Sequence, residues 1–335
     1  MRRRALLGAA LLAGAIGFAR PVPAQAAAVK IWRALDLTAL PLLVMEHEHL
    51  IERTAEAMGL GGVSIAWSIP AKSGPAEALA AGGADLVAAE LVSFLAAADS
   101  SAGTPAEIRG LGALSQRPYV LVTRNPAIRT IRDFGTASRI AVPALKLSGP
   151  AVMLEMAAAQ EWGLEHFDRL SRLAVARPDA AAAAALISGK GDIDAHFSQT
   201  PYADDELANP AIHRIMDSFD IAGPHSIAIL ATTMPFRNAN PELCKAILSA
   251  LQQAGDLIQK SPGAAAEIYV AMAKDQTIPL EDLSDMIGDP DLAYRAAPAG
   301  VMRFADFMHR IGRLKHRPAA WRDRFLPEAR DLPGS

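Results

Sequence analysis

Short aliphatic runs alternate with longer helical patterns from residue 29 onward, and this alternation constrains the fold most. Between the runs, apolar residues recur at helical spacing, as over 43–58 before Gly59 and over 152–162 before Gly163. Strands that alternate with helices predict an α/β protein. The predicted strands cover residues 29–34, 63–67, 84–88, 119–123, 140–143, 170–175, 192–196 and 227–232.

The last third of the chain changes to helix after helix. Asn240 is a predicted N-cap, with Pro241 at the first helical position. Ser261 and Pro262 repeat this start signal, and a further apolar stripe runs through 301–311. Because no strand-rich module follows, we expect these helices to pack back on the earlier sheets.

One sequence pattern occurs twice and indicates an internal duplication. Residues 78–88 and 185–195 both read A-L-x-x-G-x-x-D-[L/I]-x-A, which fits the end of a helix, a glycine cap and the start of a buried strand. A single copy would describe any helix-to-strand junction. The recurrence, after β-α-β-α-β series of similar length, predicts two α/β lobes of related topology. A chain of 335 residues also suits about two domains.

The N-terminus has the three parts of a secretory signal peptide. Arginines at 2–4 precede an apolar stretch over 5–19, and the Ala-Gln-Ala at 24–26 is a cleavage site. Residues 3–7 also fit the core of a twin-arginine signal, so the general secretory and twin-arginine routes both stay open. We expect a signal peptide over 1–26 and a mature protein in the periplasm.

Composition excludes several classes of protein. A chain with 51% hydrophobic residues can build a core, so it is not disordered. Its formal net charge is -3, and removal of residues 1–26 discards four arginines and no acid, which gives -7. No nucleic-acid partner is therefore expected. The single cysteine, Cys244, excludes an intrachain disulfide, a multi-cysteine metal site and a lipid anchor near the cleavage site. No later stretch of about 20 residues lacks charge, so we expect a soluble mature protein.

Ligands of open α/β sheets gather at the carboxyl ends of strands, where loops lead into helix N-termini. Two of these loops contain the tetrapeptide Ser-Gly-Pro-Ala, at 73–76 and at 148–151, each with a lysine close by. We predict two anion-accepting helix starts, one in each lobe, although ordinary helix capping also explains such a tetrapeptide. The predicted loops at the strand ends cover residues 36–41, 68–75, 90–94, 144–150, 176–179 and 197–202.

Aromatic residues and a histidine lie in or beside the same loops. Trp67, Phe197 and Tyr202 form either an apolar wall for an organic ligand or part of the core. His196 is either a hydrogen-bond donor in the cleft or an interior histidine with its hydrogen bonds satisfied. The acidic residues at 204–206 are interpreted as solvated surface.

No catalytic or metal-binding motif is present. The histidines in His47-Glu48-His49 are two residues apart and would point to different faces of a helix, so we expect no metal site there. The G-x-S-x-G, Walker and G-x-G-x-x-G signatures are missing. These absences disfavour the common hydrolases, nucleotidases and dinucleotide enzymes, and we expect no cofactor.

The order and spacing of several segments resemble the periplasmic substrate-binding proteins of ABC importers, in the nitrate, sulfonate, taurine and thiamine-precursor branch. The sequence departs from that family at 46–49 and at 148–150, and it lacks an obvious arginine pair that would clamp a sulfonate. The matching segments are 40–44 with the following helix to 60, 73–85, 129–143 with its Asp-Phe-Gly turn, 189–197 and 232–243.

The resemblance implies a type II periplasmic-binding-protein fold with two lobes joined by two crossover strands. The first lobe would contain 27–120 and 228–335, and the second 121–227. Ligand would bind in the cleft, which closes by a hinge. Carried over by position, the residues that line the cleft are Leu40, Pro41, Ser73, Gly74, Ser148, Gly149, His196 and Phe197, to which we add Trp67.

The expected function is capture of a small anionic or polar organic solute, similar to a sulfonate, nitrate or bicarbonate, for delivery to an ABC permease. Such a protein is not an enzyme, and we expect a monomer. One alternative is an exported sensor or partner-binding module of the same fold. The other, a thiamine-pyrimidine synthase, needs a Cys- and His-rich iron motif, which a chain with Cys244 alone cannot form.

The signal-peptide interpretation predicts where the exported protein begins. N-terminal sequencing of the protein recovered from the periplasm should find a start near Ala27, because the cleavage site precedes it. Exported protein that still begins at Met1 would contradict this interpretation.

Overall fold

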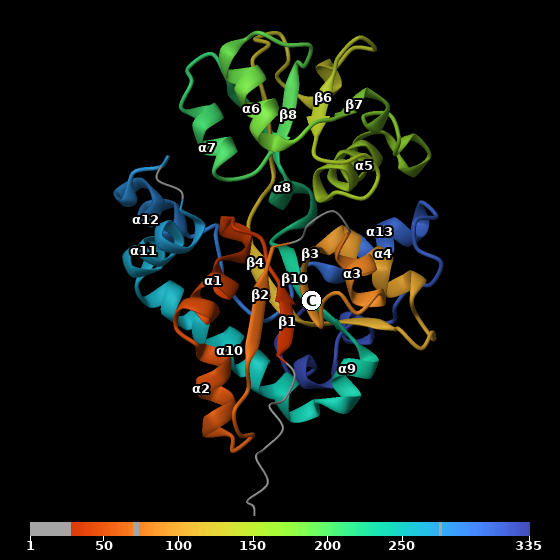
Figure 1. Ribbon diagram of the computed structural model, residues 1–335. Helices are drawn as coiled ribbons and strands as arrows, with labels where there is room; N and C mark the ends of the chain where they lie inside the picture. The colour runs from red at the N-terminus through yellow and green to blue at the C-terminus, as the bar shows by residue number, and fades with distance from the viewer. Residues whose placement is uncertain (1–27, 70–73, 275–276) are drawn as a thin grey trace, which may run out of the picture.

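The computed structural model describes residues 28–69, 74–274 and 277–335, and in it the chain forms two lobes (Figure 1). Each lobe is built on a five-stranded sheet, so the predicted two-lobed α/β class is confirmed. The signal peptide predicted over 1–26 lies outside the described residues. The strands are β1 (Val29–Trp32), β2 (Ile65–Ser68), β3 (Leu86–Glu90), β4 (Ile108–Gln116), β5 (Val120–Thr123), β6 (Ile140–Val142), β7 (Ala174–Ala176), β8 (Ala195–Ser198), β9 (His213–Asp217) and β10 (Ser226–Thr233).

The two sheets have the same topology. The order is β2-β1-β3-β10-β4 in the first lobe and β7-β6-β8-β5-β9 in the second. The strands β1 and β6 each pair in parallel with both neighbours. The strands β10 and β5 each run antiparallel to both neighbours. Each of these antiparallel strands begins just after the chain has crossed from the other lobe. The matching topology confirms the duplication predicted from the repeated sequence pattern.

The repeated pattern marks equivalent junctions with an offset between the two copies. Asp85 accepts the backbone N–H of a residue in the neighbouring strand β1 at 2.8 Å. Asp194 accepts the backbone N–H of the residue before β6 at the same distance. The sequence pattern aligns Asp85 with Asp192, whereas these contacts equate it with Asp194. Counted from the aligned glycines Gly82 and Gly189, the second copy is therefore two residues longer before the equivalent aspartate.

The long helix α10 (Pro241–Lys260) supports the first lobe. It contacts α1 (Leu40–His47), α2 (Leu50–Ala57), α11 (Pro262–Ala273) and strand β4. The C-terminal helices thus pack on the first sheet, as the sequence predicts. The other α-helices are α3 (Pro75–Ala80), α4 (Leu91–Ser100), α5 (Gly149–Trp162), α6 (Asp179–Ser188), α7 (Tyr202–Leu207), α8 (Ser218–Ala222), α9 (Met234–Ala239), α12 (Leu280–Gly288) and α13 (Val301–Arg310).

The helix expected over 43–58 is interrupted. His49 adopts a left-handed backbone conformation with φ of 52°, and it separates α1 from α2. The apolar spacing continues across this break, so periodicity alone could not locate it. The helix expected over 152–162 is confirmed as α5, which ends at Gly163 with φ of 96°.

Each of the eight predicted strands overlaps an observed one, but β4 and β9 have no predicted counterpart. Strand β4 contains Gly110 and Gly112, and glycine inside a strand weakens a β pattern. Both glycines permit close packing, since a Cβ on Gly110 would lie 2.5 Å from the ring of Phe325. Strand β9 reads HRIMD and is only partly buried, so it lacks an aliphatic run.

The two segments that cross between the lobes are tied to each other. The N–H of Tyr119 donates to Ser218 Oγ, and the N–H of Ser218 donates to the carbonyl of Tyr119, both at 2.9 Å. Ser218 Oγ also lies 2.7 Å from His225 Nε2. Burial lowers the pKa of His225 to about 4, so its neutral ring accepts the hydroxyl proton of Ser218 at neutral pH. The crossovers therefore form one hydrogen-bonded joint.

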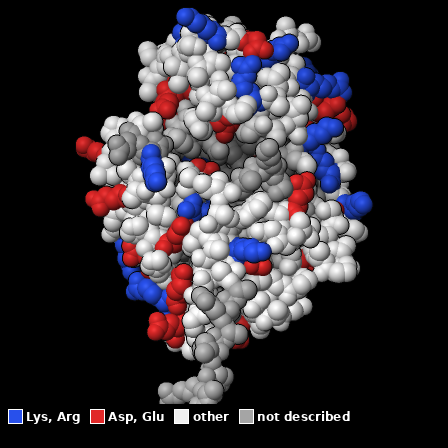
Figure 2. Space-filling model, in the orientation of Figure 1, with Lys and Arg blue, Asp and Glu red and all other residues white. Residues whose placement is uncertain are grey.

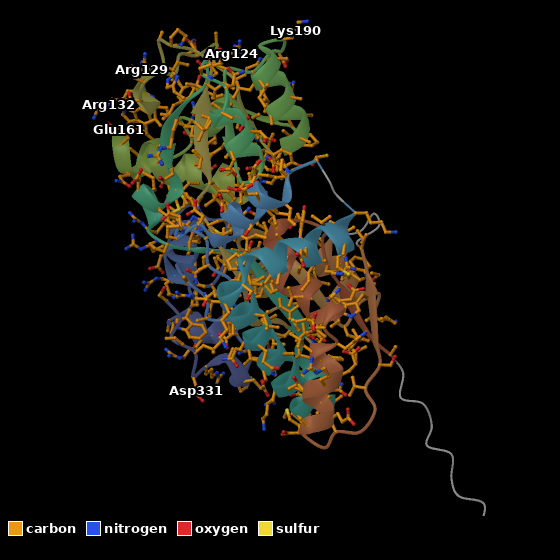
Figure 3. The ribbon with its side chains drawn as sticks, turned by 90° about the vertical axis from the view of Figure 1, so that its left-hand side faces the viewer. Arg124, Arg129, Arg132, Glu161, Lys190 and Asp331 are labelled. Carbon is orange, nitrogen blue, oxygen red and sulfur yellow. The ribbon has the colours of Figure 1, made fainter. Side chains whose placement is uncertain are left out.

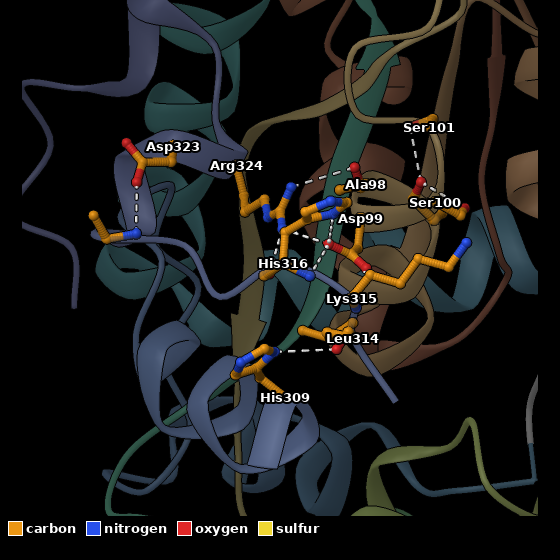
Figure 4. A network of polar contacts seen from close by, with 12 residues as sticks. Ala98, Asp99, Ser100, Ser101, His309, Leu314, Lys315, His316, Asp323 and Arg324 are labelled. Atoms are coloured by element: carbon orange, nitrogen blue, oxygen red, sulfur yellow. Dashed lines mark hydrogen bonds and ion pairs between the residues drawn. The ribbon is translucent and has the colours of Figure 1, made fainter. Parts of the chain in front are cut away.

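Asp99 of α4 binds the C-terminal segment at residues 315–324 (Figure 4). Its carboxylate accepts the backbone N–H groups of Lys315 and His316, at 2.6 and 3.1 Å. It also pairs with Arg324 at 2.8 Å. Burial alone would raise the pKa of Asp99, but the hydrogen bonds and the guanidinium hold it below 3.8. One ionised carboxylate thus satisfies donors from three residues of the C-terminal segment.

Loss of the Asp99 carboxylate should destabilise the first lobe. The Asp99→Ala variant leaves the guanidinium of Arg324, whose side chain is only 9% exposed, without its anion. We expect the free energy of unfolding to fall by about 3 kcal/mol, as for other broken buried ion pairs. The matched control is Asp306→Ala, which breaks the exposed pair with Arg317 and should leave stability nearly unchanged. Denaturant unfolding that ranks the two variants equally would contradict this role.

Candidate ligand-binding cleft

A cavity of about 260 Å³ lies between the two lobes. Figure 2 shows this region as a hollow, with acidic side chains at its upper edge. Its wall contains residues of both lobes and of the crossover at Tyr119, so a molecule bound there would touch both lobes. The lining residues are Ala34, Asp36, Thr38, Ala39, Ala88, Ala89, Glu90, Tyr119, Pro143, Pro150, Asp179, Gln199, Ile227 and Ala228.

The polar lining residues follow the carboxyl ends of parallel strands. Asp36 comes after β1, Glu90 is the last residue of β3, and Asp179 opens α6 after β7. These carboxyl ends meet at one edge of each sheet, and the two edges face each other across the cavity. All three acids lie in loops that the sequence places at strand ends.

Glu90 joins the two lobes directly. Its Oε1 accepts the backbone N–H of Gly149, at the start of α5, and the hydroxyl of Tyr119 at 2.9 Å. Burial raises the pKa of Glu90 to about 7, the two hydrogen bonds oppose that rise, and nearby Asp179 adds to it. Burial and the proximity of Glu90 also raise the pKa of Tyr119, so the phenol stays protonated and donates.

Asp179 belongs to a buried polar chain in the second lobe. His196 lies between two carboxylates, with Nδ1 at 2.8 Å from Glu206 Oε1 and Nε2 at 3.2 Å from Asp179 Oδ1. Burial lowers the pKa of His196, but the hydrogen bonds to Asp179 and Glu206 outweigh it and the net pKa is raised. The amide of Gln199 donates to Asp179 Oδ2 at 3.2 Å. His196 thus holds the Asp179 carboxylate in place.

His196 is an interior histidine with both ring nitrogens in hydrogen-bond contact, and its side chain is fully buried. This decides between the two interpretations left open by the sequence. The solvated-surface interpretation of 204–206 is wrong for Glu206, whose side chain is also fully buried. Helix α7 turns Glu206 inward toward His196 and leaves Asp204 and Asp205 exposed.

Both predicted helix starts have their N–H groups occupied by carboxylates of the protein itself. The N–H of Gly74 donates to Glu77 Oε2 at 2.7 Å, within α3, and the N–H of Gly149 donates to Glu90. Gly149 also allows a close approach, because a Cβ there would lie 2.4 Å from the hydroxyl of Tyr119. Ser148 caps α5 through its side chain. The structure places both glycines in capping contacts.

None of the described residues predicted to bind ligand lines the cavity itself. Leu40 and Pro41 are buried at the start of α1, and Phe197 is buried with its ring 6.3 Å from that of Tyr119. Trp67 lies on the edge strand β2. Ser73 lies outside the described residues. Several lining residues adjoin a predicted one in sequence, as Ala39 adjoins Leu40 and Pro150 adjoins Gly149.

The described residues hold no group of three or more His, Cys, Asp or Glu side chains suited to a metal ion. Over the same described ranges, no helix combines the length and apolar character that crossing a membrane requires.

Comparison with known proteins gives a fold match without a sequence match. No protein-family model matches the chain, and neither does any curated protein. The aliphatic sulphonate-binding protein SsuA of Escherichia coli superposes with a TM-score of 0.68 at 18% identity, over 90% of this chain and 98% of that one. The chain has the fold of a periplasmic binding protein.

Two further structures agree with this assignment. The nitrate-binding protein NrtA of Synechocystis PCC 6803 matches with a TM-score of 0.66 at 13% identity, covering 90% of this chain and 86% of that one. SsuA of Xanthomonas axonopodis pv. citri, bound to MOPS, matches at 0.65 and 18% identity, over 88% and 96%. The resemblance to the nitrate and sulfonate branch is therefore confirmed at the level of the fold.

The raised pKa of Glu90 predicts a measurable pH dependence. Between pH 4.5 and 7 the folded protein keeps a proton that the unfolded chain has released, so the stability due to this group falls as pH rises. A pKa of about 7 in place of 4.5 corresponds to about 3 kcal/mol. The free energy of unfolding of Glu90→Gln, relative to wild type, should rise by about that amount across this interval. Glu281→Gln, at an exposed site on α12, should follow wild type. Parallel profiles for Glu90→Gln and wild type would refute the raised pKa.

Proposed function

We propose that this chain is the solute-binding component of an ABC import system, exported to the periplasm, and that it is not an enzyme. The observation that carries the proposal is the cavity between two lobes of matching topology, in the fold of SsuA and NrtA. A binding protein requires a cleft that closes around its solute by a hinge motion, and it requires no nucleophile. We propose lobe boundaries at 27–120 with 228–335 and at 121–227, and an ABC permease as the membrane partner.

The contacts between the lobes suit opening and closing about the crossovers. Glu90 of the first lobe binds the N–H of Gly149 in the second. At a separate point, Arg313 pairs with Glu155 of α5 at 2.5 Å and also donates to the carbonyl of Lys146. Arg117 of the first lobe also donates to the carbonyl of Thr200 in the second at 2.7 Å. Opening of the cleft would break polar contacts of this kind. A solute that touches both lobes would stabilise the closed arrangement.

The sequence predicts a small solute that is either anionic or polar. The residues of the cavity wall support a polar solute and do not support an anionic one. A polar solute suits a cavity with three carboxylates, a tyrosine and a glutamine in its wall. An anion such as a sulfonate or nitrate receives no support, since no lysine or arginine in the described part of the chain lines the cavity. We therefore propose a polar organic solute.

A solute screen tests the proposed function. Thermal shift should find at least one ligand among sulfonates, nitrate, bicarbonate, carboxylates, pyrimidines and amines, because a solute at 100 times its dissociation constant stabilises by about 2.7 kcal/mol. Small-angle scattering should show a smaller radius of gyration when that solute saturates the protein.

A cavity-filling variant provides the control for this screen. Ala34→Trp places a large side chain in the cavity wall and should abolish binding, whereas the exposed Ala271→Trp on α11 should not. The proposal fails if no solute both stabilises and compacts the protein, or if folded Ala34→Trp binds as wild type does.

A further inference from the structure

We infer that the solute of this cleft is an organic cation, such as an ammonium or amidinium compound. The inference rests on the proposed function and names the substrate class of the same site. It starts from the charge of the cavity wall, which contains the carboxyl groups of Asp36, Glu90 and Asp179 and no basic side chain among the described residues. These groups come from both lobes, so a bound cation would be held from two sides.

Acceptor atoms remain free at the cavity. Both hydrogen bonds to Glu90 go to Oε1, and Oε2 has no hydrogen-bond partner among the described residues. The hydrogen bonds to Asp36 likewise go to Oδ1, from Thr38 and Ala39. Gln199 Oε1 is buried and has no partner in the part of the chain that the structure describes. The wall thus offers acceptors to a ligand rich in N–H donors.

Three arginines with partners outside the wall do not line the cavity, although Nε and Nη2 of Arg117 are buried without a hydrogen-bond partner among the described residues. Arg33 pairs with Glu46, and Arg313 pairs with Glu155. Arg117 is buried and donates to the carbonyl of Thr200 at 2.7 Å. Of the wall carboxylates, Asp179 has a basic partner, His196, which it shares with Glu206. Asp36 and Glu90 form no ion pair with a basic side chain in the described part of the chain.

Several basic residues of the second lobe lie at its outer end (Figure 3). Figure 3 shows Arg124, Arg129 and Lys190 at the end of this lobe that points away from the first lobe. Arg132, in the same region, pairs with Glu161. At such a distance, solvent and salt screen their charge from the cavity. An anion in the cleft would face Asp36 and Glu90, which have no paired cation, whereas a cation would be attracted by both.

The start of α5 supports the same ligand class. Tyr119 lines the cavity beside Glu90, and its ring is buried against His225 and Phe197. The predicted helix start at Gly149, the feature that favoured an anion, is occupied by the Glu90 carboxylate. The protein thus supplies its own anion at α5 and leaves the cavity side of that carboxylate for a cation.

Isothermal titration with probes of similar shape and different charge tests the inference. Benzamidinium, benzamide and benzenesulfonate form an aromatic series, and butylammonium, butanol and butanesulfonate an aliphatic one. We expect the cation of at least one series to bind ten times or more tightly than its neutral partner, with no binding of the sulfonates. Preference for a sulfonate, equal binding across charge, or no binding of either cation at 10 mM would overturn the inference.

Substitution of the carboxyl groups in the cavity wall tests whether a cationic probe binds in the cleft. Asp36→Asn retains the side-chain oxygen that caps the following turn and removes only charge, so it should fold and weaken binding of the cationic probe at least threefold. Asp179→Asn and Glu90→Gln should weaken it tenfold or more, and the exposed Glu281→Gln should not change it. Unchanged affinity in Asp36→Asn and in folded Asp179→Asn would also overturn the inference.

The outcome separates the two proposals. A sulfonate or neutral solute that binds and reduces the radius of gyration would contradict the cationic class and leave the solute-binding function standing. A chain that no solute of the broad screen compacts would contradict the function itself.

Discussion

The arrangement of this molecule depends on the hydrogen bond from the Gly149 N–H to the Glu90 carboxylate. It joins the end of β3 in the first lobe to the start of α5 in the second, and the hydroxyl of Tyr119, at a crossover, donates to the same oxygen. One oxygen thus receives donors from the second lobe and from the hinge. Because this group is buried, its pKa rises to about 7, so the contact is sensitive to pH near neutrality. Any solute that enters the cavity meets this carboxyl group.

This bond also decides what kind of site the cleft offers. The N-terminus of a helix attracts anions, and the α5 terminus would be such a site if it were open. Glu90 fills it, and Glu77 fills the corresponding position at Gly74. With both helix starts satisfied internally, the polarity of the cavity is set by carboxylates in its wall. We therefore propose a cationic solute for this cleft, although the chain shares its fold with sulfonate- and nitrate-binding proteins.

The sequence predicts the architecture better than the site. Alternating runs and the repeated pattern identify eight strands and two related lobes, because these depend on local periodicity. Strand β4 is not predicted because Gly110 weakens its β pattern. The reason for this glycine is the close contact with the ring of Phe325, a residue far away in the sequence. The burial of Glu206 is not predicted for a similar reason, since only tertiary packing brings it to His196. The sequence predicts the loops that contain Asp36, Glu90 and Asp179. It does not identify these three side chains as site residues, because only the packing of the two lobes brings them to one cavity.

The most direct test of this account is the titration of the Glu90 carboxyl group by carbon-13 NMR, with the resonance assigned by its loss in Glu90→Gln. We expect a midpoint near pH 7, because burial between the lobes outweighs the two hydrogen bonds to the carboxylate. We also expect that a bound cation lowers this midpoint, since a nearby positive charge favours the ionised form. A midpoint near 4.5, the ordinary value for glutamate, would contradict this expectation, because burial would then not outweigh the two hydrogen bonds.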